Sequence, residues 1–388
     1  MNTKKILWVN PSFLDYRIPL YKELNILLDN KFHLIYSEAR IPERCNTKIK
    51  NNLAANAHPV AKESRISFGA KEQEFANTSV SIPIPRGLSK MIRSVKPDLI
   101  IAEGFFQFTP WAVWYSWIHR IPLLVAYERT AHTERHCPWW RRAYRKFINR
   151  FVSGYIANGQ MTKEYLISQG VKSDDIFTGG MCADSKNLSE SVSSMTIEDR
   201  INFKRDIGIP DDSGVIYLYV GQLIERKGVC YLLNAWKDHV KQYGNDVLLI
   251  TGGGELLERF KTDFGDIHSI IFSGLIDYSV IYKYYAISDV FIIPTLEDNW
   301  SLVVPEAMAC GLPIACSIYN GCYPELVIKD RNGCTFDPLD ADSMKEALSY
   351  FHHVDLERLG NNSKIIESNY SPSNTAKNIV QAINTYCG

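Results

Sequence analysis

Three acidic residues follow a short apolar run in the second half of the chain. The run Val290 to Ile293 predicts a buried parallel strand, and Glu297 and Asp298 lie in the polar loop after it. Glu306 lies eight residues beyond Asp298, inside a short helix predicted over Leu302 to Cys310. Carboxylates at a helix start can cap free N–H groups, or they can accept hydrogen bonds from sugar hydroxyls while the N–H groups face phosphate. The residues alone leave both roles open.

A glycine-bounded loop, Gly221 to Gly228, directly follows another predicted strand, Val215 to Val220. Its Arg226 and Lys227 can offer cations to a diphosphate, although neighbouring Arg and Lys side chains are more often simply solvated. A third predicted strand ends at Gly274-Leu275. Since loops at the carboxyl ends of parallel strands meet at one edge of a sheet, we expect these segments to lie close together.

These segments resemble the donor site of glycosyltransferase family 4, whose members are retaining enzymes with the GT-B fold. In the family's E-x7-E motif, Asp298 replaces the first Glu and Glu306 matches the second. The run 305–314, Pro-Glu-Ala-Met-Ala-Cys-Gly-Leu-Pro-Ile, matches closely. In the family's Gly-Arg-Leu…Lys-Gly loop, Lys227 falls on the Lys position and Gln222 replaces the Arg. The donor-binding residues that the resemblance implies are Gly221, Gln222, Arg226, Lys227, Gly274, Leu275, Asp298, Asn299, Trp300, Ser301, Leu302 and Glu306.

The resemblance also implies a role for each charged group. Glu306 would bind the ribose of a nucleotide-diphosphate sugar, most simply a UDP-sugar, and Asp298 the hydroxyls of the transferred sugar. Lys227, helped by Arg226 and the helix start, would stabilise charge on the departing diphosphate. We assign catalysis to Lys227 and Asp298, together with Glu128 in the first half of the chain.

Polar residues also follow the predicted strands of the first half. Glu128 ends one strand, and Arg129 and His132 come directly after it. Many family members place a His where Glu128 stands, so we expect Glu128 to orient the donor or the acceptor. Arg17, in the loop after the first strand, joins Arg129 and His132 as an acceptor-side candidate. A local salt bridge is the alternative for Arg17, and simple exposure the alternative for His132.

Composition narrows the class of protein. The chain has 388 residues, of which 46% are hydrophobic and 22% charged, so we expect two globular domains rather than disorder. Its 43 Lys and Arg balance its 43 Asp and Glu, which leaves no global electrostatic case for nucleic acid. Nine scattered cysteines without C-x-x-C spacing favour reduced thiols, and no apolar run is long enough for a membrane span. We therefore expect a cytoplasmic protein, free or peripheral on the inner face of the membrane.

Predicted strands alternate with helices along the chain, which favours parallel doubly wound sheets. A stretch rich in Ser, Asn and charge, 185–194, is the predicted interdomain link. We predict a GT-B architecture, α/β, with an acceptor-binding Rossmann-like domain over 1–190 and a nucleotide-sugar-binding one over 191–370, facing a central cleft. A C-terminal helix within 371–388 would pack back toward the N-terminal domain. Residues 41–80 are polar and irregular and predict no definite element.

The segment 139–150 combines aromatic residues with Arg and Lys and contains no acid. Such a helix suits an anionic membrane surface, and a surface helix with its aromatics in the core is the alternative. The cluster from Phe105 to Trp117 suits either a lipid acceptor or the core. Nucleic acid is disfavoured, because no binding module accompanies the cations.

No cluster of His, Cys or acidic residues has metal-ligand spacing at a predicted strand end, so we expect neither a metal nor another cofactor. The sequence thus predicts a retaining glycosyltransferase with a nucleotide-sugar donor and a glycan or lipid-linked acceptor, in cell-surface polysaccharide or glycolipid synthesis. Another GT-B enzyme, such as a sugar-nucleotide epimerase or a phosphorylase, is an alternative. A non-catalytic sugar-nucleotide-binding protein is the alternative outside enzymes.

Overall fold

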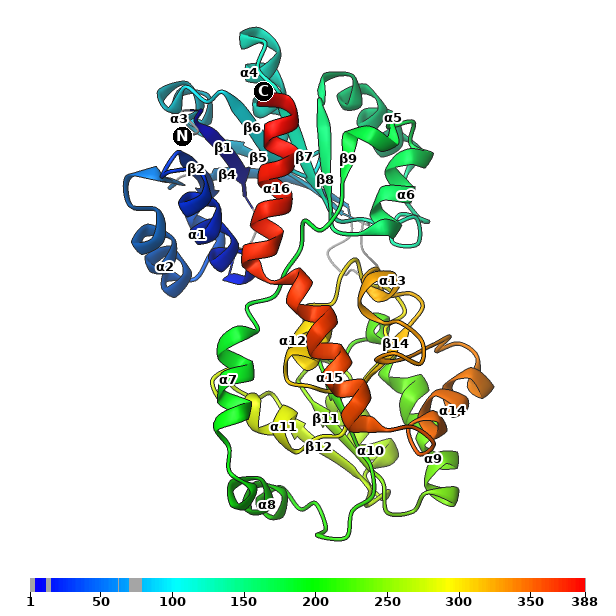
Figure 1. The fold of residues 1–388 in the computed structure, drawn as a ribbon. Helices are drawn as coiled ribbons and strands as arrows, with labels where there is room; N and C mark the ends of the chain where they lie inside the picture. The colour runs from blue at the N-terminus through cyan, green and yellow to red at the C-terminus, as the bar shows by residue number, and fades with distance from the viewer. Residues whose placement is uncertain (1–3, 12–14, 62, 70–78, 388) are drawn as a thin grey trace. The chain divides into compact units, whose positions relative to one another are not determined.

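The computed structural model describes residues 4–11, 15–61, 63–69 and 79–387, and the chain divides into two compact units (Figure 1). The first unit comprises Met1–Cys182 with Tyr370–Gly388, and the second comprises Ala183–Asn369. Each unit is built on its own parallel sheet with helices on both faces, as the alternating pattern predicted. All nine cysteines are free thiols, and all but Cys230 are buried.

The sheet of the first unit has seven strands in the order β3-β2-β1-β6-β7-β8-β9, all parallel. Val9 pairs with Ile35 on one side and with Ala102 on the other. Since the chain runs outward from β1 to β2 and then returns to place β6 on the other side of β1, the strand order reverses between β1 and β6. Ligands bind at such reversals in open α/β sheets. The strands are β1 Ile6–Asn10, β2 Phe32–Ser37, β3 Ala57–Val60, β6 Leu99–Glu103, β7 Leu123–Tyr127, β8 Gly154–Ala157 and β9 Ile176–Phe177.

Two sets of helices bury the two faces of this sheet. One set is α1 Ile18–Leu27, α2 Glu43–Leu53 and the C-terminal α16 Pro372–Cys387, whose apolar residues share one core. The other set is α3 Leu88–Val95, α4 Thr109–His119, α5 Trp139–Ile148 and α6 Gln160–Ser168, which share the second core. The C-terminal helix α16 packs along α1, so the last segment of the chain belongs to the unit that contains the first.

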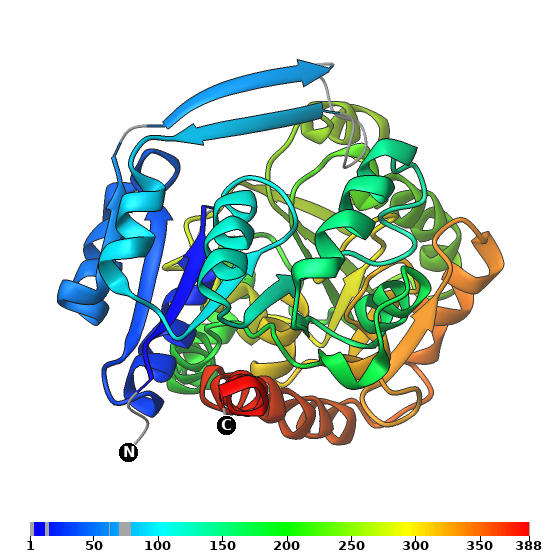
Figure 2. The ribbon, with the colours of Figure 1, turned by 90° about the horizontal axis from the view of Figure 1, so that it is seen from above.

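Residues 41–80, for which the sequence predicted no definite element, hold several. Helix α2 buries Cys45, Ile49 and Leu53, which recur every four residues. Strand β3 extends the sheet, and β4 Glu63–Gly69 pairs with β5 Ser79–Pro85 as an antiparallel ribbon, visible at the top of Figure 2. These elements were not predicted, because Pro42 and the many polar residues leave no clear hydrophobic periodicity in this segment.

The sheet of the second unit has six parallel strands in the order β12-β11-β10-β13-β14-β15. Its order reverses between β10 and β13, the two strands that precede the predicted donor loops. The strands are β10 Ile216–Val220, β11 Val247–Thr251, β12 Ile270–Gly274, β13 Val290–Ile293, β14 Ile314–Ser317 and β15 Gly333–Phe336. The helices are α7 Lys186–Ser194, α8 Ile197–Asp206, α9 Val229–Gln242, α10 Leu257–Phe264, α11 Tyr282–Ile287, α12 Val303–Ala309, α13 Tyr323–Leu326, α14 Ala341–Tyr350 and α15 Leu356–Glu367.

The stretch 185–194, predicted as the interdomain link, is instead helix α7 of the second unit. It packs on α11 and α12, and the Ser189 hydroxyl donates to the Ala309 carbonyl at 3.0 Å. Leu188 and Val192 are buried on its inner face. The spacing of these two apolar residues outweighs the polar composition that suggested a linker.

Candidate active site

Lys227 and Asp298 meet at the strand reversal of the second sheet. Lys227 ends a short helical turn after β10, and Asp298 lies in the loop after β13. The Lys227 Nζ atom lies 2.5 Å from Asp298 Oδ2, and each side chain is 14% exposed. Gly228 follows with a φ of 67°, and a Cβ there would lie 2.1 Å from the Pro294 carbonyl oxygen. Only glycine therefore lets the two loops approach closely enough to form this pair.

The surroundings of Asp298 keep it ionised. The Ser301 hydroxyl donates to Oδ2 at 2.7 Å, and the Trp300 N–H donates to Oδ1 at 3.1 Å. Burial opposes the charged form, but the Lys227 ammonium and the Ser301 hydroxyl outweigh it and hold the pKa of Asp298 below its usual range. The site thus keeps a carboxylate and a cation side by side at the end of the sheet.

Arg226 has a different set of contacts from its neighbour. Its Nη1 atom donates to the Glu297 carbonyl at 3.2 Å, while its own carbonyl accepts from the Leu296 N–H at 2.9 Å. The Thr295 hydroxyl also donates to that carbonyl. These bonds tie the loop after β10 to the loop after β13, so Arg226 positions the loop that carries Asp298.

Glycines at 252 and 254 let the loop after β11 lie beneath the loop after β10. Gly252 has a φ of 144°, and a Cβ there would lie 1.8 Å from the Gly221 carbonyl oxygen. The backbone N–H groups of Gly221 and Leu223 donate to the carbonyls of Thr251 and Gly253. Gln222 and Leu275, both predicted to contact the donor, are exposed at this edge. Trp300 is buried, so its indole packs inside the loop rather than standing out from it.

Glu306 occupies the first turn of α12 and accepts hydrogen bonds from two tyrosines. The Tyr278 hydroxyl lies 3.0 Å from Oε1, and the Tyr285 hydroxyl lies 3.3 Å from Oε2. Burial raises the pKa of Glu306 to about 7, with a smaller contribution from Asp184, although both tyrosine hydrogen bonds act in the opposite direction. Neither tyrosine was predicted from the sequence, because no motif links them to the acid.

The first unit also places an ion pair at its strand reversal. Arg17 Nη2 lies 2.8 Å from Glu103 Oε1, and Arg17 is only 3% exposed. The Trp8 indole N–H donates to Glu103 Oε2 at 3.0 Å, and Arg17 Nη1 donates to the Gly180 carbonyl. Burial and the nearby Glu128 raise the pKa of Glu103, against the effect of Arg17. Glu103 was not predicted, although it ends β6 much as Glu128 directly follows β7, and that position was a usable signal.

A pocket of about 140 Å³ opens beside this pair. Its walls include Glu103, Phe106, Glu128, Arg129 and Arg145, so two of the predicted first-unit residues line it. His132 is not among the lining residues; its carbonyl accepts hydrogen bonds from the Arg135 backbone and side chain.

Glu134 organises the cationic wall of this pocket. It is buried and pairs with Arg145 at 2.5 Å and with Arg129 at 3.3 Å. Burial opposes ionisation of Glu134, but the two guanidinium groups hold its pKa below the usual range. Two cations of the segment 139–150, Arg145 and Arg141, are therefore buried and unavailable to an anionic membrane surface.

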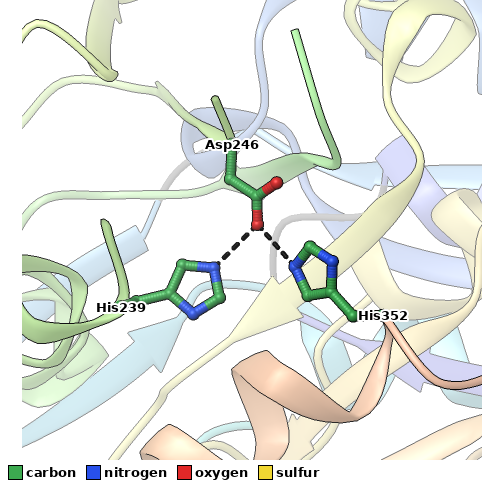
Figure 3. Close-up of side chains that lie close together, drawn as sticks. All are labelled: His239, Asp246 and His352. Carbon is green, nitrogen blue, oxygen red and sulfur yellow. Dashed lines mark hydrogen bonds and ion pairs between the residues drawn. The ribbon is translucent and has the colours of Figure 1, made fainter. Parts of the chain in front are cut away.

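One group of three potential metal ligands occurs among the side chains that the structure describes: His239, Asp246 and His352 (Figure 3). Asp246 Oδ2 lies 2.8 Å from His239 Nε2 and 2.7 Å from His352 Nε2, while Oδ1 accepts from the Val215 N–H. These are hydrogen-bond distances that satisfy the carboxylate and tie α9 to the turn after α14. Asp246 immediately precedes β11, at the amino end of the sheet, so this group lies at the edge opposite Lys227 and Asp298.

Family models match both units. The model described as Glycosyltransferase Family 4 matches residues 58–178, and the model described as Glycosyl transferases group 1 matches residues 214–353. An uncharacterized glycosyltransferase of Methanocaldococcus jannaschii is 33% identical over 154 residues, covering 39% of each chain. A GDP-mannose-dependent phosphatidylinositol monomannoside mannosyltransferase of Mycolicibacterium smegmatis is 28% identical over 38% of this chain and 41% of its own. The matches thus span about two fifths of these relatives. The alpha-monoglucosyldiacylglycerol synthase of Acholeplasma laidlawii is 25% identical over 74% of each chain.

Solved structures match over nearly the whole chain. A glycosyltransferase from Rickettsia africae aligns with a TM-score of 0.75 at 15% identity, over 100% of this chain and 99% of its own. The Anabaena protein HepE in complex with UDP aligns with a TM-score of 0.74 at 15% identity, over 98% and 100%. At such identity the likeness establishes the fold alone. A glycosyltransferase model thus matches a segment of each unit, and both sheets are parallel as in the GT-B fold; together these findings support a glycosyltransferase of the family 4 type.

Proposed function

We propose that this protein transfers a sugar, with retention of anomeric configuration, from a UDP-linked donor to a glycan or lipid-linked acceptor. The observation that supports this most strongly is the Lys227–Asp298 pair at the strand reversal of the second sheet, with Glu306 in the first turn of the helix that follows the Asp298 loop. A cation, an ionised carboxylate and a second carboxyl held by tyrosines match the three parts of a nucleotide-diphosphate sugar. The UDP in the HepE complex, bound to a protein of the same fold, is consistent with this choice.

In this proposal Glu306 accepts hydrogen bonds from the ribose hydroxyls, with Tyr278 and Tyr285 fixing its carboxyl group. Asp298 accepts from hydroxyls of the transferred sugar, since its pKa is held low and its charge persists. The Lys227 ammonium stabilises negative charge on the diphosphate as the glycosidic bond breaks. This cation does the work that a divalent metal does in other nucleotide-sugar enzymes, so we propose that no metal is needed.

The acceptor is proposed to bind the first unit, at the pocket beside Glu103 and Glu128. Arg129 and Arg145 give one wall of this pocket positive charge, which suits a phosphate-bearing acceptor. Two of the relatives described above are named for lipid acceptors, which supports a lipid-linked acceptor and a product in cell-surface polysaccharide or glycolipid synthesis. Glu128 would orient the bound groups rather than form a covalent intermediate.

Nucleotide release tests the proposal. A panel of UDP- and GDP-sugars is incubated with the protein, with and without a lipid extract, and the freed nucleotide is measured. Acceptor-dependent release that falls by roughly 100- to 1,000-fold in Lys227→Met supports transfer, because one lost charge-stabilising donor typically has that effect. Lys241→Met, which changes an exposed lysine of the same unit, is the matched control.

Three outcomes would contradict the proposal. UDP binding without release of nucleotide under any acceptor condition would identify a sugar-nucleotide-binding protein. Conversion of the donor sugar without an acceptor would identify an epimerase. A product of inverted configuration in the anomeric NMR signal would remove the retaining mechanism.

A further inference from the structure

The helices α3, α4 and α5, which lie on one face of the first sheet, carry a strongly unbalanced charge. The segments 86–96, 109–120 and 135–151 contain no Asp or Glu, although the chain as a whole has equal numbers of acids and bases. Most of their cations are exposed. These exposed cations are Arg86, Lys90, Arg93, Lys96, Arg120, Arg135, Arg142, Lys146 and Arg150.

The same layer exposes large apolar side chains. Trp139 is 79% exposed, Trp117 64% and Phe147 54%, and Trp114 and Ile118 are each 48% exposed. Phe151 joins the two helices, since its ring lies 6.5 Å from that of Trp117 on α4 and 5.4 Å from that of Phe147 on α5. A cluster of exposed aromatic side chains indicates an interaction surface, whereas single exposed hydrophobic residues are common on any protein.

Helix α5 exposes aromatics while it buries arginines. Arg145 turns inward to Glu134, and Arg141 is buried with its guanidinium over the rings of Phe106 and Trp140. Trp139, Lys146 and Phe147 face outward on the same helix. Ile148 of α5 joins the core, but Trp139 and Phe147 point away from it, which is the arrangement expected when the partner outside is itself apolar.

An open hollow of about 290 Å³ lies beside these aromatics. It is lined by Ser89 of α3 and by Pro110, Trp111 and Trp114 of α4. Lys90 lies next in sequence to Ser89 and is exposed. An apolar hollow flanked by a cation suits the upper part of an acyl chain below an anionic headgroup.

We propose that the outer surface of α3, α4 and α5 binds an anionic lipid bilayer. The tryptophans and Phe147 insert at the level of the headgroups, and the exposed cations contact the negatively charged lipids around them. The inference rests on the proposed function in one respect: a bilayer would be the source of a lipid-linked acceptor. Phe106, which lines the pocket of the first unit, also stacks on Tyr144 and meets the edge of Trp140, so α5 contributes to both the pocket and the surface.

Vesicle co-sedimentation tests the surface without donor or acceptor. The full chain is mixed with vesicles of equal parts phosphatidylcholine and phosphatidylglycerol, or of phosphatidylcholine alone. We expect binding to the anionic vesicles that weakens with salt, and a loss of about fivefold for each exposed cation removed. The test variant is Arg142→Ser/Lys146→Ser/Arg150→Ser. The matched control is Lys241→Ser/Arg259→Ser/Lys261→Ser, which removes three exposed cations from the second unit.

A second variant, Trp117→Ser/Trp139→Ser, separates insertion from simple charge attraction. Quenching of tryptophan fluorescence by brominated lipid should occur in the wild type and fall in this variant. Absence of binding to anionic vesicles at low salt overturns the proposal, and so does equal loss in the control triple variant. Single-stranded RNA that binds with the same salt dependence, displaces the vesicles and ignores the tryptophan changes would assign the surface to nucleic acid. Vesicle binding by a protein that transfers no sugar would refute the proposed function alone.

Discussion

Each of the two sheets has an ion pair where its strand order reverses, and the two pairs affect their carboxyl groups in opposite ways. In the first unit, burial and the nearby Glu128 raise the pKa of Glu103 even though Arg17 lies 2.8 Å away. In the second, Lys227 and Ser301 hold the pKa of Asp298 low despite burial. The topology is the same and both carboxyl groups are buried, so the difference comes from their other neighbours. The Glu128 carboxylate opposes the charge of Glu103 in spite of the Trp8 N–H, whereas the Ser301 hydroxyl supports the charge of Asp298.

The cations differ as well. The Arg17 guanidinium is shared between Glu103 and the Gly180 carbonyl, and its side chain is almost fully buried. Lys227 has one short contact, to Asp298, and remains partly exposed. The planar guanidinium of Arg17, fixed by two acceptors, suits a structural role. The ammonium of Lys227, on a flexible side chain, suits exchange between a carboxylate and a ligand phosphate. We therefore expect the first pair to matter most for stability and the second for transfer.

The largest effect is expected from the acids of the second unit. Glu306→Ala should weaken binding of free UDP by roughly 10- to 150-fold, the value of a hydrogen bond to a charged group. Asp298→Ala should leave UDP affinity nearly unchanged and reduce transfer far more, because Asp298 is proposed to contact only the sugar. Calorimetric titration with UDP and a transfer assay measure the two quantities. Equal loss of UDP affinity in both variants, with folded protein, would mean that the changes damage α12 rather than separate contacts.

Next in size is the stability effect of the first pair. Arg17→Met leaves the Glu103 carboxyl without its guanidinium and should cost about 2 kcal/mol, below the usual cost of breaking a buried pair because Glu103 can take up a proton. Thermal unfolding should show the transition of the first unit lowered by roughly 4–8 °C, with UDP affinity preserved. The exposed Arg150→Met serves as control. An unchanged unfolding temperature would show that the Arg17–Glu103 pair does not stabilise the first unit, and the two ion pairs would then not differ in the way proposed.

A pH titration sharpens the contrast between Glu306 and Asp298. The pKa of Glu306 is raised to about 7, so its carboxylate forms as pH rises through neutrality. If ribose needs that carboxylate, UDP affinity should rise by about tenfold from pH 6 to pH 8. Asp298, with its lowered pKa, is ionised throughout this range. Glu306→Gln should remove the step that the carboxyl causes and leave only the titration of the nucleotide phosphate; an identical step in that variant would contradict the assignment.

The smallest expected effect is that of chelation. If Lys227 supplies the cation at the diphosphate, as proposed, transfer in excess EDTA should stay within about twofold of the untreated rate. Loss of activity that manganese or magnesium restores would show that the lysine does not replace a metal. Lys227→Met measured in the same buffers provides the comparison, since a metal-dependent site would respond to both treatments.

The sequence determined the elements whose signals are local. The apolar run Val290 to Ile293 is the strand β13, and Gly311 ends the short helix α12 that begins one residue after its predicted start. The two-unit α/β architecture also follows from the alternation of strands and helices. Polar segments were harder to predict, because α2 and α7 bury only two to four side chains each, and their composition resembles that of loops.

Tertiary structure decided what no spacing encodes. Tyr278 and Tyr285 meet Glu306 only because α11 and its preceding loop pack near α12, and Glu103 meets Arg17 only because β6 lies beside β1. The orientation of α5 is the clearest case, since its cations and its aromatics lie on different sides of the helix and either side could have faced the core. A buried carboxylate in the preceding loop, Glu134, turns Arg145 inward, while Trp139 and Phe147 stay outside. A buried charge is costly without a partner, so the pairing and not the hydrophobic pattern fixes which face of that helix is exposed.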